Sequence, residues 1–114
     1  MRLEFNFVAP SLNKLNSSFW KMYNLKKRFL RYLKNYELLG LKEPKKMKVI
    51  ITVCNSRLLD YDNLVGGNKK LVDCLKQKKL IWDDRPEYLI VEYRQEKCKR
   101  GLERTIVEIE NIAG

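Results

Sequence analysis

The feature that most constrains the fold is an apolar run at residues 47–54, whose centre is the stretch Val49-Ile50-Ile51-Thr52-Val53. β-Branched side chains suit a pleated strand better than a helix. Only Thr52 is polar within the stretch, so both faces of such a strand need to be covered by other parts of the chain. The run therefore predicts a strand in the middle of a sheet.

Periodicity indicates a strand and a helix before this run. Residues 2–8 alternate between apolar and polar side chains, as in a half-buried strand, and Pro10 ends the alternation. A helix is expected next, capped by an Asn or Ser among residues 16–18 and ending at residues 39–40. Its apolar stripe recurs at spacings of three and four: Met22, Leu25, Phe29, Leu33 and Tyr36.

After the run, residues 55–67 are expected to form a loop, and Asn68 to cap a second helix that continues to about residue 79. A turn at residues 83–86 precedes two further strands, at 88–95 and 104–110. There is no repeat or linker. The sequence therefore predicts a single α+β domain over residues 1–114, with a mixed sheet of about four strands packed with two helices.

The charge of the chain favours a polyanionic partner. Lys and Arg number 24 against 14 Asp and Glu, a formal net charge of +10, and nucleic acid is the commonest partner of such a protein. The outward face of the first helix and the tip between the last two strands are basic. The alternatives are a basic protein kept soluble by its charge, with a solvated helix face, and a ribosomal-type binder. The residues expected to contact DNA are Lys14, Lys27, Arg28, Arg31, Lys34, Lys70, Lys97, Lys99 and Arg100.

Composition excludes several kinds of chemistry. The chain has no histidine, which removes most zinc sites and any histidine base. Its three cysteines form no Cys-x-x-Cys pair, so neither a disulfide framework nor a zinc ribbon is indicated. No apolar run has the length of a membrane span or a secretory signal. We expect a soluble cytoplasmic protein, without a membrane partner or a small-molecule cofactor, whose chemistry depends on carboxylates, lysines or a hard metal ion.

All five aspartates lie between positions 60 and 84, whereas the glutamates are spread along the chain. Aspartate is a short carboxylate that suits Mg²⁺, and carboxylates gathered together repel one another unless a cation neutralises them. Asp60 and Asp62 would project to the same side of an extended segment. Asp73 follows Lys69 by four residues on the second helix, and Asp83 and Asp84 lie in the turn after it. The set predicts a Mg²⁺ site.

Each aspartate also has a structural interpretation. Asp and Asn are common in turns, so the segments around Asp60 and Asp83 could be turns only. Asp73 and Lys69 could form a surface ion pair that contributes little. A basic nucleic-acid-binding module without catalysis is therefore the alternative to a metal site.

The residues of this stretch resemble the motif of the RusA family of Holliday junction resolvases, in a form found in phage. The matching segments are Asp60-Tyr61-Asp62-Asn63-Leu64, then Lys69, Asp73 and Leu75, then Leu80-Ile81-Trp82-Asp83-Asp84. The segment Pro10-Ser11-Leu12-Asn13-Lys14 is similar to the Pro-Ser-x-Asn entry of the family. A glycine-containing insert, Val65-Gly66-Gly67-Asn68, separates Asn63 from the lysine, and Lys69 is taken as that lysine rather than Lys70 because of its spacing to Asp73.

The resemblance implies an endodeoxyribonuclease that uses Mg²⁺, or Mn²⁺ in its place, to hydrolyse phosphodiesters in four-way or otherwise branched DNA. Paired nicks imply a homodimer, and a bacterial or phage-borne gene. The metal ligands implied are Asp60, Asp62 and Asp84, with Asp83 beside them. Lys69 would stabilise charge on the phosphate, and Asn63 and Asp73 would orient these groups.

Overall fold

The computed structural model describes residues 1–10 and 19–112. The elements follow the predicted order, with one additional helix. Lys14 and the expected cap at residues 16–18 lie outside the described residues. The elements are β1 (Arg2–Phe5), α2 (Phe19–Leu33), a 3₁₀ helix (Lys34–Leu39), β2 (Met47–Asn55), α3 (Tyr61–Gly67), α4 (Lys69–Gln77), β3 (Leu89–Lys97) and β4 (Arg104–Asn111).

The four strands form one mixed sheet in the order β1-β4-β2-β3. β4 is antiparallel to both β1 and β2, whereas β2 and β3 are parallel, with Met47 opposite Leu89 and Asn55 opposite Lys97. A parallel pair needs a crossover connection, and α3 and α4 provide it. The apolar run does form the central part of the sheet, as predicted, because β2 has a neighbour on each side.

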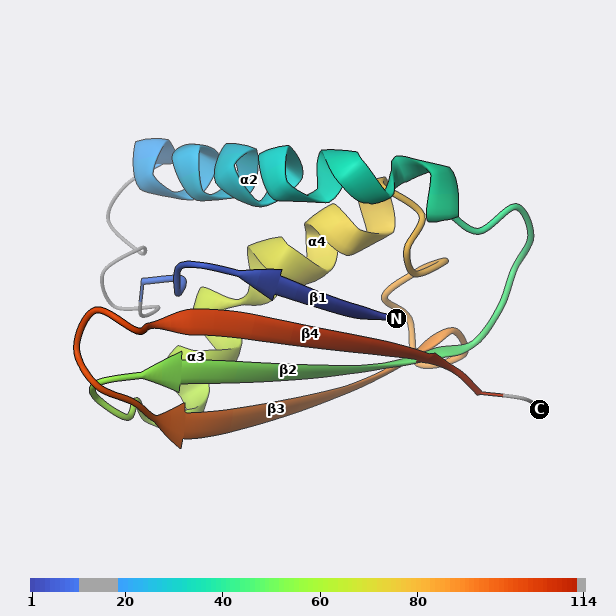
Figure 1. Ribbon diagram of the computed structural model, residues 1–114. Helices are drawn as coiled ribbons and strands as arrows, with labels where there is room; N and C mark the ends of the chain where they lie inside the picture. Colours follow the sequence, from blue (N-terminus) through green and yellow to red (C-terminus); the bar gives the residue numbers. More distant parts are fainter. Residues whose placement is uncertain (11–18, 113–114) are drawn as a thin grey trace.

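Helices α2 and α4 lie over the same face of the sheet (Figure 1). Alternate residues of β2, such as Val49 and Ile51, are fully buried beneath them. From α2, Phe29 packs its ring edge-on against Phe5, with centroids 5.6 Å apart. Leu71, Cys74 and Leu75 of α4 complete the core with no exposed surface. The burial of Leu25, Phe29 and Leu33 confirms the apolar stripe predicted for the first helix.

The opposite face of the sheet carries no helix (Figure 1). Acidic and basic side chains alternate there and form ion pairs, Arg94 with Glu92 at 2.9 Å and Arg104 with Glu4 at 3.2 Å. Long charged side chains cover apolar neighbours with their stems, which accounts for the burial of Ile50 on this face. None of the helices described is long and apolar enough to cross a membrane.

Several details differ from prediction: β1 ends at Phe5 rather than at residue 8, and the crossover between β2 and β3 differs in three respects. Residues 55–67 are not all loop, because α3 occupies Tyr61–Gly67. Asn68 precedes α4 but makes no side-chain capping bond; its Nδ2 instead donates to the carbonyl of Leu64 at 2.8 Å. Helix α4 ends at Gln77, before Lys79 takes a left-handed conformation with φ of 60°.

Candidate active-site cleft

A cleft of about 590 Å³ lies between α4 and β3. Alternate residues of β3 line one side, because side chains two apart in a strand share a face. The amino half of α4 and the turn before β3 supply charged groups to the other side. The lining residues are Met22, Gly66, Lys69, Lys70, Val72, Asp73, Asp84, Leu89, Val91 and Tyr93.

The charged lining of the cleft includes four residues that the sequence singled out: Lys69, Lys70, Asp73 and Asp84. Asp73 forms its ion pair with Lys70, three residues away, at 3.9 Å; the expected neighbour was Lys69. Lys69 is exposed at the cleft. The cleft therefore holds an ion pair on α4 and an exposed ammonium beside it, which suits an anionic ligand such as phosphate.

A cluster of ion pairs holds Asp83 and Asp84. The Lys76 ammonium lies 3.1 Å from Oδ1 of Asp83 and 3.6 Å from Oδ1 of Asp84. Nε of Arg85 donates to Oδ2 of Asp83 at 2.9 Å, and the backbone N–H of Asp84 donates to Oδ1 at 2.7 Å. The hydrogen bond from Lys76, above all, holds the pKa of Asp83 far below its usual range.

The two carboxylates consequently have different roles in the structure. The side chain of Asp83 is 18% exposed and accepts bonds that stabilise the turn, whereas that of Asp84 is 50% exposed and lines the cleft. Lys76 was not among the residues predicted from the sequence. The available signal was its position in the last turn of the second helix, which points the lysine toward the turn that follows.

Asp60 and Asp62 stand at the beginning of α3, and the extended geometry expected for them is wrong. Asp60 occupies the position before the helix, where its carbonyl accepts a bond from the N–H of Leu64 at 2.9 Å. Asp62 is already in the first helical turn. Residues four apart on a helix share a face, so Asp62 lies on the same side of α3 as Gly66, which lines the cleft.

Asp60 and Asn63 line a different hollow of about 620 Å³, at the carboxyl end of β2. The loop before Asp60 is fastened to the far end of β3, since Gln95 exchanges two hydrogen bonds of 2.8 Å with the backbone of Leu59. Leu89, which lines the cleft with Asp84, is six residues earlier in β3, or ~20 Å at about 3.3 Å per residue. Asp60 and Asp84 thus line different hollows.

The donor chemistry of these acids fits a hard divalent cation, which prefers carboxylate oxygens. Within residues 1–10 and 19–112, no group of three or more acidic or cysteine side chains lies close enough to hold a metal ion. Only Asp83 and Asp84 lie together, against Lys76, among the aspartates described; Asp60 lines the second hollow, and Asp62 is exposed in the first turn of α3. Because Mg²⁺ often binds through one or two carboxylates together with substrate phosphates, the half-exposed carboxylate of Asp84 in the cleft fits such an ion.

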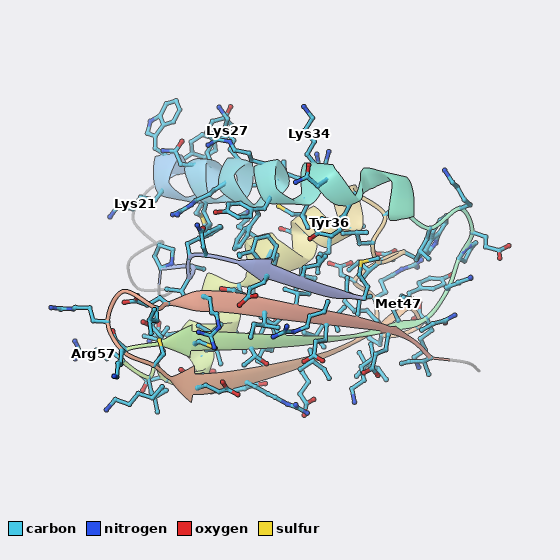
Figure 2. The ribbon with its side chains drawn as sticks, in the orientation of Figure 1. Lys21, Lys27, Lys34, Tyr36, Met47 and Arg57 are labelled. Carbon is cyan, nitrogen blue, oxygen red and sulfur yellow. The ribbon has the colours of Figure 1, made fainter. Side chains whose placement is uncertain are left out.

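The predicted basic surfaces lie on two parts of the molecule. On α2, Lys27 and the following Lys34 point away from the sheet (Figure 2). The Arg28 guanidinium instead lies 3.8 Å from the centre of the ring of Phe7, a residue that follows β1. Arg28 therefore packs against the domain and does not project outward with Lys27. Lys97, Lys99 and Arg100 are exposed around the turn between β3 and β4, as predicted.

Compared with known proteins, the chain matches no family model and no curated protein.

Proposed function

We propose that the protein is a Mg²⁺-dependent endodeoxyribonuclease that cuts four-way or otherwise branched DNA. The observation that carries the proposal is the cleft between α4 and β3. It gathers Lys69, Asp73 and Asp84, which are separated in sequence but belong to one motif. Asp62, in the first turn of the neighbouring helix α3, lies on the same side of that helix as Gly66, which lines the cleft. The cleft thus combines carboxylates with cationic groups, as a phosphodiester-cleaving site requires.

Each residue would have a separable task. Asp84, half exposed in the cleft, and Asp62 would hold the cation, with Asp83 beside Asp84; Asp60, a ligand implied by the resemblance, lines a separate hollow. A bound Mg²⁺ or Mn²⁺ would supply Lewis-acid polarisation of the phosphodiester and a nucleophilic water. Lys69 would contact the scissile phosphate, where its positive charge favours the transition state over the substrate. Asp73 keeps Lys70 beside it through the ion pair at 3.9 Å.

Two observations favour a second candidate, a basic nucleic-acid-binding module without catalysis. Lys76 already neutralises Asp83 and Asp84. Among the described residues, moreover, no three acids are close enough to share a metal ion. Such a module would bind DNA without cutting it, and Mg²⁺ would not raise its melting temperature.

The deciding experiment is incubation of the purified protein with a four-way junction, a flap and a linear duplex, with and without Mg²⁺. Nicking of the branched substrates that requires Mg²⁺ is expected. Asp62→Asn and Asp84→Asn should each abolish nicking and leave junction binding intact, whereas Glu110→Gln, an exposed acid on β4, should cut normally. If both Asp variants cut at the wild-type rate, the proposal is wrong.

A paired cut at a junction needs two active sites, so the proposed enzyme is a homodimer that acts on DNA in a bacterial cytoplasm. On a cruciform plasmid, a dimer releases linear product because both nicks fall within one encounter. A monomer accumulates nicked circles first. Sedimentation at the assay concentration measures the mass of the protein and so shows whether a dimer or a monomer produces the cuts.

A further inference from the structure

Three aromatic side chains are exposed in the first turns of α2. Phe19 is 74% exposed, Trp20 68% and Tyr23 45%. Their rings contact one another, with centroids between 5.8 and 6.3 Å apart. Grouped aromatic side chains of this size on a surface mark an interaction site more often than chance exposure. We refer to these three residues as the aromatic cluster.

The aromatic cluster does not help hold α2 to the sheet. The core side of α2 consists of Leu25, Phe29 and Leu33, each at most 6% exposed. Trp20 precedes Phe29 by nine residues, which at ~100° per residue places it on the opposite side of the helix. The cluster is therefore additional to the packing of the domain.

Cations continue the same outward surface along the helix. The spacing of Trp20, Tyr23, Lys27, Arg31 and Lys34 (three, four, four and three) keeps all five near one line, ~21 Å long at about 1.5 Å per residue. The Lys27 ammonium lies over the Tyr23 ring, 5.3 Å from its centre. Figure 2 shows Lys27 and Lys34 directed away from the sheet.

The charge of α2 is of one sign. The helix contains five Lys and Arg and no Asp or Glu, whereas on the open face of the sheet acids and bases are paired. A second copy docked here by a two-fold axis would set these cations against one another. An anionic membrane would require an apolar face to insert, but the apolar face of α2 is buried in the core. A polyanion with flat apolar groups fits both halves of the surface.

We propose that this surface binds unpaired nucleotides of a DNA strand. Bases stack on the aromatic cluster, and the phosphates that follow contact Lys27, Arg31 and Lys34. Paired bases are stacked on their neighbours and offer only their edges, so a regular duplex cannot use the rings. The proposal deepens the proposed function, on which it rests for the identity of the polyanion as DNA. Branched DNA has unpaired nucleotides where its arms meet.

The surface shares its helix with the cleft. Met22, between Trp20 and Tyr23 in sequence, lines the cleft from the inner side of the same helix. The beginning of α2 and the carboxyl end of β2 lie toward the same side of the molecule (Figure 1). The surface and the cleft therefore lie on two sides of the same helix.

Fluorescence provides a direct test, in EDTA so that no cleavage occurs. The chain has two tryptophans, and Trp82→Phe leaves Trp20 as the only one. Stacking predicts that a dT12 oligonucleotide quenches Trp20, whereas inorganic polyphosphate, a 12-base-pair blunt duplex and vesicles of anionic phospholipid do not. Equal quenching by polyphosphate, or quenching by vesicles and not by dT12, overturns the proposal.

Affinity measured by anisotropy of labelled dT12 does not depend on Trp82. Trp20→Ala should weaken binding by about 5- to 150-fold, the loss of one stacked base, and Trp20→Phe by much less. Lys27→Gln should weaken dT12 and polyphosphate alike. Unchanged affinity of Trp20→Ala, or a change in its sedimentation without a change in affinity, overturns the proposal. Asp84→Asn distinguishes the two ideas: if it cuts normally while dT12 binding follows Trp20, only the catalytic assignment fails.

Discussion

Truncation of two phenylalanines on the same helix should change the free energy of unfolding by very different amounts. Phe29 has no exposed surface, and its ring contacts those of Phe5 and Phe7 at 5.6 and 5.3 Å. Phe29→Ala leaves a cavity at this point, and such a change costs about 3–5 kcal/mol. Phe19 is 74% exposed, so Phe19→Ala should change the free energy of unfolding by no more than about 0.5 kcal/mol.

These energies convert to clear shifts in melting temperature. The entropy of unfolding of a chain of this length is about 0.24 kcal/mol/K, taken from roughly 2.1 cal/mol/K per residue. Phe29→Ala should therefore melt about 12–21 °C below the wild type, and Phe19→Ala within about 2 °C of it. The free energy of unfolding expected for a chain of this size is about 6–17 kcal/mol. Over most of that range, either variant would remain folded at 20 °C.

Thermal denaturation followed by far-ultraviolet circular dichroism measures both shifts in the same buffer. Tryptophan is unchanged in both variants, so fluorescence can serve as a second probe of the same transition. A loss of less than about 5 °C for Phe29→Ala would contradict the core described here. A loss for Phe19→Ala as large as that for Phe29→Ala would show that the aromatic cluster packs against the domain, and the argument for an exposed nucleotide surface would fail with it.

Three further predictions concern single interactions. Thr105→Val removes the buried donor to the carbonyl of Phe7, a bond of 2.8 Å; the unsatisfied carbonyl should cost about 1–3 kcal/mol and lower the melting temperature by about 4–12 °C. Lys76→Met removes the main cause of the low pKa of Asp83, so in an NMR titration that carboxyl should titrate nearer pH 4. Because the folded pKa is lowered, the stabilisation from this pair is complete above about pH 4 and decreases as the pH falls below it, and acid unfolding of the variant should lack this part. Burial raises the pKa of the Cys74 thiol to about 11; at pH 8 it should react with a disulfide reagent only when denaturant opens the fold, and fast labelling in the native state would contradict its burial.

Sequence periodicity was sufficient for the elements whose side chains alternate over a long stretch. The predicted strand at 104–110 is β4, and the basic turn before it is present. The alternation survives in the fold because residue i and residue i+2 of a strand share a face whatever the strand pairs with. Helix α3 was missed because a short segment with two glycines has low helical propensity. Leu64, at 2% exposure, shows that burial outweighs that propensity here.

The residues of the candidate site could be found from the sequence, but their contacts with one another could not. The clustering of the aspartates identified the acids, and the resemblance to the RusA motif placed Lys69 with Asp73 and Asp84 in one set; all three line one cleft in the fold. It could not show that Lys76 would lie between Asp83 and Asp84, since that depends on how the turn after α4 folds back. Nor could it show that Asp60 would line a separate hollow.

What the sequence by itself determined is which residues of each element face the core, because that follows from the local period of the backbone. Only the tertiary structure decided which side chains from different elements lie near one another, because that depends on which ends of the strands and helices are adjacent. The parallel pairing of β2 with β3 sets the loop before α3 beside Gln95 and the turn after α4 at the opposite end, near Leu89. That pairing is made between residues about forty apart in sequence, so no local pattern specifies it. It is also why Asp60 lines a different hollow from the cleft that Asp84 lines.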